Sequence, residues 1–161
     1  MILTETRLRH FTRVTDLDRD DLADVLDLAS ACKSDARPDD VLRGQTVACM
    51  FEHPSTRTHL SFAAAIARLG ATPILVGRDK VQLGRGETIA DTARSLSGYC
   101  AAIVTEGYPQ EAVDELAQWA SVPVINAVSD EQHPCQVLAE TRFGGNRIVD
   151  MLVGDPLPRI C

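Results

Sequence analysis

The chain has 161 residues, of which 45% are hydrophobic, and carries a formal net charge of −7 at pH 7. This length and composition are those of a folded domain with a buried core, and they exclude a disordered chain. The acidic balance argues against general nucleic-acid or membrane-surface binding, although a local site can still hold a small anion. No apolar run approaches the length of a membrane span.

The five cysteines are odd in number and show no C-x-x-C spacing. This arrangement predicts reduced thiols, no metal site and a cytoplasmic protein. Cys49 and Cys100 stand in apolar stretches, so we expect them to be buried.

Residues 15–33 have the apolar spacing of an amphipathic helix, with aspartates near its N-terminus. After Gly44, short apolar strands alternate with helices. The predicted strands are residues 46–51, 72–76, 101–105 and 122–127, with a fifth at 147–154. The predicted helices are residues 55–69, closed by Gly70, 87–97, closed by Gly98, 110–119, and 133 to about 141. We therefore expect a three-layer α/β domain: a central parallel sheet of about four strands with helices on both faces.

A candidate anion site follows the first strand. Ser55 is a favoured N-cap residue, and the first helical turn carries Thr56, Arg57 and Thr58. The backbone N–H groups of a first turn have no partners within the helix, and the helix dipole favours an anion there. The hydroxyl groups and the guanidinium add donors suited to phosphate oxygens. Plain capping of the helix with an incidental arginine is the alternative.

A second group follows the fourth strand and so reaches the same edge of the sheet. His133 stands at the start of the next helix, where the dipole favours a neutral imidazole. Its N–H can stabilise charge that develops on a carbonyl oxygen, and the amide of Gln136 can both accept and donate. Simple helix capping is again the alternative. Cys135 is interpreted as a packed residue, because adjacent side chains rarely form a Cys–His catalytic pair.

Four motifs occur in order: F-E-H-P-S-T-R-T at 51–58, Q-L-G-R-G-E at 82–87, D-T-A-R at 91–94 and H-P-C-Q-V-L-A at 133–139. Over about residues 3–140 the chain resembles the N-terminal half of the aspartate/ornithine carbamoyltransferases, with more similarity to the ornithine branch. The resemblance implies transfer of a carbamoyl group from carbamoyl phosphate to an amine, without a cofactor, a metal or a covalent intermediate. It also implies a homotrimer whose sites lie between subunits.

The same resemblance assigns roles to individual residues. Phosphate or carbamoyl phosphate would be held by Ser55, Thr56, Arg57 and Thr58, with Gln82 supplied by a neighbouring subunit. His133 would polarise the carbonyl group as the catalytic residue, and Gln136 would bind the carbamoyl amide.

Two departures from the family stand out. The family has an arginine shortly after the third strand, and the alignment places Glu106 there, with no other arginine between Arg94 and Arg142. At an effective dielectric of about 20, two unit charges about 4 Å apart interact by roughly 4 kcal/mol, so the exchange should weaken phosphate binding. A second, smaller exchange places His59 where arginine is frequent. We expect that histidine on the surface or at an interface.

The second departure is length. We expect residues 1–140 to form the carbamoyl-phosphate-binding domain, and residues 141–161 to form a linker and the truncated start of an acceptor-binding domain. A domain that is catalytically incomplete alone is the favoured hypothesis, with ornithine as the favoured acceptor. A non-catalytic phosphate-binding or trimer-forming paralogue and a degenerate, truncated gene product are the alternatives.

Overall fold

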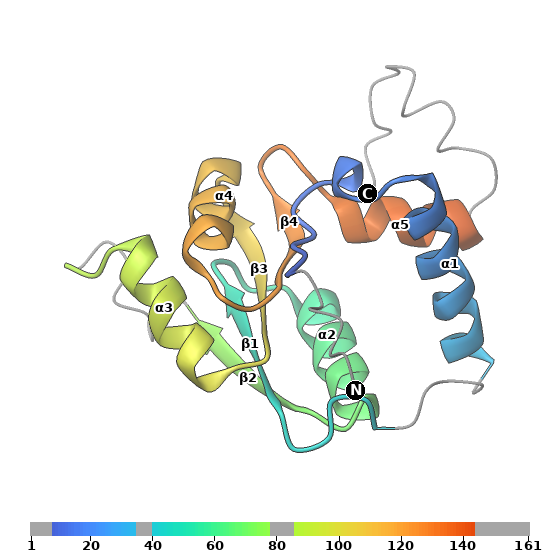
Figure 1. The fold of residues 1–161 in the computed structure, drawn as a ribbon, viewed down its shortest axis with the longest axis horizontal. Coiled ribbons are helices and arrows are strands. Elements are labelled where there is room, and N and C mark those ends of the chain that lie inside the picture. Colours follow the sequence, from blue (N-terminus) through green and yellow to red (C-terminus); the bar gives the residue numbers. More distant parts are fainter. Residues whose placement is uncertain (1–7, 35–39, 78–85, 144–161) are drawn as a thin grey trace, which may run out of the picture.

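The computed structural model describes residues 8–34, 40–77 and 86–143 (Figure 1). Its centre is a parallel sheet of four strands in the order β2-β1-β3-β4. The strands are β1 (Thr46–Phe51), β2 (Thr72–Gly77), β3 (Ala102–Tyr108) and β4 (Val124–Ser129). A 3-10 turn, η1 (Val14–Asp16), precedes the helices α1 (Arg19–Lys33), α2 (Thr56–Arg68), α3 (Ile89–Tyr99), α4 (Gln110–Trp119) and α5 (Pro134–Phe143). The predicted α/β class and parallel sheet are confirmed.

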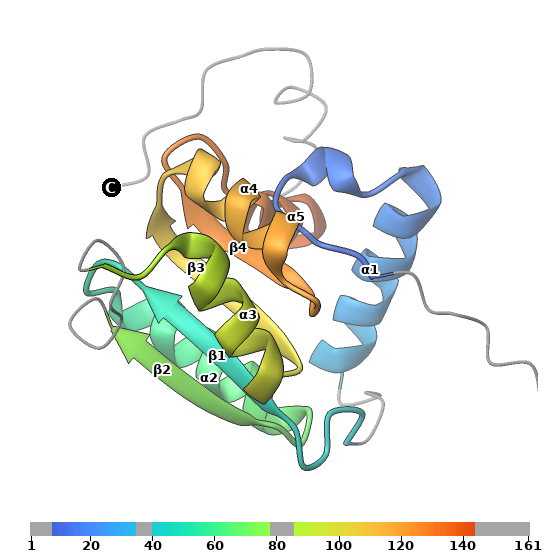
Figure 2. The ribbon, with the colours of Figure 1, turned by 60° about the vertical axis from the view of Figure 1, so that its left-hand side comes forward.

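Helices cover both faces of the sheet, because the buried strands carry apolar side chains on both sides. In β1, Cys49 and Phe51 pack in one core cluster with Ile66 of α2. Met50, between them in the sequence, packs in a second cluster with residues of α3 and α4, including Ala93 and Val113. Figure 2 shows α3 on the near side of the sheet and α2 behind it. The structure therefore has the three layers that the alternating elements predicted.

Several element boundaries differ from the prediction. The predicted helix at 15–33 is divided, since η1 ends at Asp16 and α1 begins only after Asp18, whose side chain accepts from two backbone N–H groups. Gly98 does not close α3, which continues to Tyr99. Gly70 does follow the end of α2 with a positive φ of 86°, as predicted. The fifth predicted strand, at 147–154, lies outside the described residues. Among the described helices, none is both long and apolar enough to cross a membrane.

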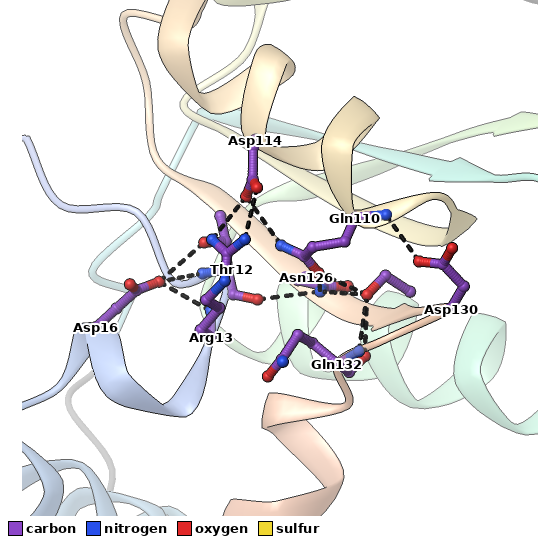
Figure 3. A network of polar contacts seen from close by, with 9 residues as sticks. Thr12, Arg13, Asp16, Gln110, Asp114, Asn126, Asp130 and Gln132 are labelled. Atoms are coloured by element: carbon purple, nitrogen blue, oxygen red, sulfur yellow. Dashed lines mark hydrogen bonds and ion pairs between the residues drawn. The ribbon is translucent and has the colours of Figure 1, made fainter.

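The N-terminal segment 8–13 covers the free edge of β4. Phe11 forms a parallel bridge to Ile125, and its backbone N–H donates to the carbonyl of Val124 at 2.8 Å. Figure 3 shows the polar network that fixes this segment. The buried amide of Asn126 donates to the Thr12 carbonyl at 3.0 Å, and Arg13 forms paired hydrogen bonds with Asp114 of α4. The segment thus joins β4 and α4 to the start of α1.

Candidate functional site

The strand order places a ligand crevice between β1 and β3. The chain adds β2 on one side of β1 and then returns to add β3 on the other side of β1, so the order of the strands reverses there. Ligands of open α/β sheets bind at such a reversal, beyond the carboxyl ends of the strands. Here the reversal lies between the paired residues Phe51 and Glu106. The helices that follow β1 and β4 begin near this edge.

The first turn of α2 presents the four residues predicted to bind phosphate. Ser55 is the N-cap, but its side chain makes no capping bond to the helix backbone. Its hydroxyl instead donates to the hydroxyl of Thr58 at 3.0 Å. Thr56 and Arg57 are exposed, and within the described chain no carboxylate forms an ion pair with Arg57. The turn therefore leaves the threonine hydroxyls and the Arg57 guanidinium available to an anion, while the Ser55 hydroxyl is engaged by Thr58.

A pocket of about 330 Å³ lies between α2 and α5. Thr58 and Phe62 line it from α2, and His133 and Gln136 line it at the start of α5. The structure thus brings together residues from the two separate motifs. Gln136 donates to the Glu140 carboxylate at 2.8 Å, which holds its amide along the helix.

His133 precedes the first residue of α5 and is partly withdrawn from water. Burial lowers the pKa of His133, and the carboxylates of Glu140 and Glu106 oppose that change. A lowered pKa favours the neutral imidazole at neutral pH. A neutral ring carries one N–H donor and one acceptor, so it can donate to a carbonyl oxygen without bringing a positive charge.

Cys135 lines the same pocket but does not form a nucleophile pair with His133. Its Sγ donates to the backbone carbonyl of Asn126 at 3.3 Å, and burial raises the pKa of the thiol to about 11. At neutral pH the thiolate required for nucleophilic attack is therefore scarce. The interpretation of Cys135 as a packed residue is supported. Cys49 and Cys100 are buried, as predicted.

Glu106 lies within β3, where its side chain is 8% exposed. The predicted strand ended at Thr105 with Glu106 in a loop, and this prediction was wrong. Gly107, with a φ of +82°, lets the pairing shift and the strand continue to Tyr108. Glu106 faces the same side of the sheet as Phe51, and its Oε2 lies 3.8 Å from Nε2 of His59. His59, expected on the surface or at an interface, has a side chain that is 30% exposed and stacks its ring on Phe51 with 4.0 Å between the ring centroids.

The family comparison agrees with this geometry. The sequence profile of the family described as "Aspartate/ornithine carbamoyltransferase, carbamoyl-P binding domain" matches residues 9–142. The chain belongs to the aspartate/ornithine carbamoyltransferase family. Residues of this carbamoyltransferase domain are 51% identical over 136 positions to the ornithine carbamoyltransferase of Parafrankia sp., covering 82% of this chain and 43% of that protein. The corresponding protein of Acidothermus cellulolyticus is 49% identical over 137 residues, covering 83% of this chain and 43% of that protein.

Solved structures resemble this carbamoyltransferase domain over a similar share of the chain. The ornithine carbamoyltransferase of Pyrococcus furiosus superposes with a TM-score of 0.78 at 42% identity, covering 83% of this chain and 44% of that chain. The Thermus thermophilus enzyme gives a TM-score of 0.78 at 32% identity, covering 85% and 50%. The chain thus spans about half the length, or less, of these relatives.

Not every residue expected for a carbamoyltransferase site is brought together. Thr58, His133 and Gln136 share one pocket, Ser55 contacts Thr58, and Thr56 and Arg57 lie on the exposed side of the same turn. Gln82 lies outside the described residues. The contact between His59 and Glu106 was not predicted from the sequence. Its only signal was that both residues stand at positions where the family resemblance led us to expect arginine.

A larger cavity of about 890 Å³ lies between the N-terminal segment and α4, away from these residues. Its charged lining is engaged in local structure: Arg9 pairs with Asp21, and Arg13 pairs with Asp114. The hydrogen bond from Arg9 lowers the pKa of Asp21 to about 2. We therefore place the candidate site at the smaller pocket beside α2 and α5.

Proposed function

We propose that this chain is the carbamoyl-phosphate-binding part of a carbamoyltransferase that acts on an amino-acid amine, with ornithine as the favoured acceptor. One observation carries the proposal: Thr58 and His133, from two separate motifs, line one pocket with Gln136 between α2 and α5. The names of the relatives, ornithine carbamoyltransferases, favour ornithine as the acceptor. A role in arginine biosynthesis and a cytoplasmic location are further parts of the proposal. The proposed domain boundary stays at residues 140 and 141.

Each group would act on a different part of carbamoyl phosphate. The phosphate would accept hydrogen bonds from the first turn of α2 and from Arg57, which stabilise the charge that grows on the leaving group. His133, neutral at the pH of the reaction, would donate to the carbonyl oxygen. Gln136 would bind the carbamoyl NH₂ through its side-chain oxygen. Catalysis would then rest on orientation and on stabilisation of developing charge.

A test uses calorimetry with carbamoyl phosphate and, separately, inorganic phosphate. We expect Arg57→Ala to weaken binding of both ligands by roughly 10- to 100-fold, because a charge-assisted hydrogen bond contributes about 1.5–3 kcal/mol. Arg68→Ala is the matched control, since Arg68 lies in the last turn of the same helix. Equal affinity in the two variants would count against a phosphate site at the first turn of α2.

A non-catalytic binding protein is a second candidate function, favoured by the buried Glu106 beside His59. Phosphate release from carbamoyl phosphate after addition of ornithine separates the two. Release that depends on ornithine supports the transferase. Binding without such release supports the second candidate.

A homotrimer is also part of the proposal. Light scattering of the intact chain measures its mass in solution. Because a trimer would let Gln82 of one subunit complete the site of another, Gln82→Ala should weaken carbamoyl phosphate binding only if the chain associates. Suppose that the chain is a monomer and that Gln82→Ala binds carbamoyl phosphate as tightly as wild type does. That result would exclude a site shared between subunits.

A further inference from the structure

A second cavity, of about 390 Å³, lies on the opposite face of the sheet from the candidate phosphate site. Residues of α3 and α4 line it, whereas residues of α2 and α5 line the candidate site. Figure 2 shows α3 and α2 on opposite sides of the sheet. Small-molecule sites in proteins have volumes of about 300–1,000 Å³, so this cavity is large enough for a compact ligand.

The walls of this cavity are apolar. Ile89 lines it at the start of α3, and Val113 and Leu116 line it from α4. Met50 of β1, which is 1% exposed, lies at the floor. Apolar walls favour a ligand with an apolar body, and the thioether of a methionine makes favourable contacts with an aromatic ring. A single aromatic ring therefore suits this part of the cavity.

One polar group at the floor is unused. Thr105 of β3 is paired with Met50 in the sheet, lines the cavity and is 1% exposed. Its hydroxyl has no hydrogen-bond partner within the described residues. A buried hydroxyl without a partner is costly, and such groups are rare in folded proteins. A ligand with a hydroxyl group at its inner end would satisfy Thr105, because each of two hydroxyls can donate or accept.

The mouth of the cavity is negatively charged. Glu87, which precedes α3, and Glu115, on α4, both line it and are partly exposed. Neither carboxylate forms an ion pair with another residue of the described chain. Among the described residues that line the cavity, none is a lysine, an arginine or a histidine. The mouth therefore attracts a cationic group and repels a carboxylate.

We propose that this cavity binds an arylalkylamine, a compact molecule with an aromatic ring, a short chain and an ammonium group. The ring lies between the apolar walls, a hydroxyl on the ring meets Thr105, and the ammonium group lies beside Glu87 and Glu115. An amino acid suits the mouth less well, because its carboxylate would lie near two others. The inference does not depend on the proposed phosphate site, since the two cavities share no lining residue.

Tyramine is the probe, because it carries all three groups. Phenethylamine lacks only the ring hydroxyl, and hydroxyphenylpropanoate has a carboxylate in place of the ammonium group. In calorimetry of the intact chain at pH 7, tyramine should bind about fivefold more tightly than phenethylamine. The propanoate should give no heat at millimolar concentration. No binding of tyramine at that concentration, or equal binding of tyramine and the propanoate, would overturn the proposal.

Three variants separate the contributions to binding. Thr105→Val keeps the shape of the side chain and removes the hydroxyl, so tyramine and phenethylamine should then bind equally. The double variant Glu87→Gln/Glu115→Gln should weaken tyramine binding by roughly tenfold. Glu111→Gln, which removes an exposed glutamate of α4 outside the cavity, should leave it unchanged. Equal losses in the double variant and in Glu111→Gln would show only general attraction to an acidic chain, and would overturn the assigned mouth.

NMR of the methionine methyl groups locates the bound tyramine. The resonance of Met50 should shift on addition of tyramine, and inorganic phosphate should not reverse the shift. A titration that leaves Met50 unchanged, or that phosphate reverses, would place tyramine elsewhere and overturn the proposal. Failure of phosphate to bind in the absence of tyramine would instead count against the phosphate site alone.

Discussion

Gly107 holds the end of β3 in a backbone conformation that other residues rarely adopt. Its φ is +82°, and an added Cβ would lie 3.0 Å from Cδ2 of His53 and 3.2 Å from Cβ of Glu52. The residue therefore fixes the approach of β3 to the loop that leads into α2. Glu106 precedes it directly, so this backbone geometry also helps to position the buried carboxylate.

We expect Gly107→Ala to lower the free energy of unfolding by about 1–3 kcal/mol, because it combines a left-handed conformation with a close contact. Gly98→Ala is the contrasting control: Gly98 lies within α3 with nothing within 4 Å of an added Cβ. There alanine should stabilise the protein by about 0.5–1 kcal/mol. Urea unfolding of both variants measures the two effects. A stabilising Gly107→Ala would contradict this account.

At the level of single residues, the sequence predicted the part of the site that depends on local pattern. Thr58 and His133 follow strands of one parallel sheet, so their convergence follows from topology. The contact of His59 with Glu106 could not be predicted in this way. It depends on β3 continuing past Thr105 and on the face to which Glu106 points, and a shift of one residue would reverse that face.

Among the elements, the N-terminal segment is held to the sheet by the backbone bridge of Phe11 and by one buried side-chain amide. Asn126 is fully buried, and its Nδ2 lies 3.0 Å from the Thr12 carbonyl, 3.1 Å from Oε1 of Gln110 and 3.2 Å from Oγ of Ser129. The ion pair of Arg13 with Asp114 lies at the surface of the same network, with both side chains more than one-third exposed. The two contacts lie close together in the network of Figure 3, but the Asn126 amide is buried and the Arg13–Asp114 pair is open to solvent.

Asn126→Ala should destabilise the protein by roughly 2 kcal/mol, since it removes the buried amide that donates to the Thr12 carbonyl. Arg13→Ala should cost less than about 1 kcal/mol, because an exposed ion pair is weakened by water and salt. Chemical unfolding at low and high salt distinguishes the two, and only the Arg13 effect should shrink at high salt. A larger loss for Arg13→Ala than for Asn126→Ala would refute this ranking.

The existence and order of the elements were predictable, and the boundaries less so. The strand Thr46–Phe51 is apolar from Val47 onward, and there the pattern gave the correct bounds. The other described strands differ from their predicted bounds by one to three residues at one or both ends. Gly98 was misassigned because glycine is tolerated in the last turn of a helix, as well as after it. The polar run near Asp18 was assigned to one helix, although its side chain caps the helix from outside.

For the whole molecule, two histidines, His10 and His133, link stability to pH. Burial lowers the pKa of His10 and of His133. Nδ1 of His10 accepts a hydrogen bond from the backbone N–H of Val124 at 3.2 Å, which requires that nitrogen to be unprotonated. Near pH 6 the folded chain therefore binds fewer protons than the unfolded chain. Its free energy of unfolding should rise with pH through this window, and this stability is lost as the pH falls below about 6.5.

We expect His10→Gln to reduce this pH dependence, because glutamine can accept the same hydrogen bond and does not titrate. The measurement is the urea midpoint at pH 5.5 and 7.5 for wild type and variant. The difference between the two midpoints should be smaller in the variant. Equal differences would show that His10 does not contribute to the linkage.

The pairing of the N-terminal segment with β4 has a consequence for synthesis of the chain. Thr12 and Asn126, which hydrogen bond to each other, are 114 positions apart in the sequence. At the elongation rate of about 5–20 residues per second, the ribosome needs on the order of 10 s to make the stretch between them. During that interval β1 and β2 can already pair, whereas residues 8–13 must wait for their strand. The earliest described residues to be translated are thus among the last to reach their native partners.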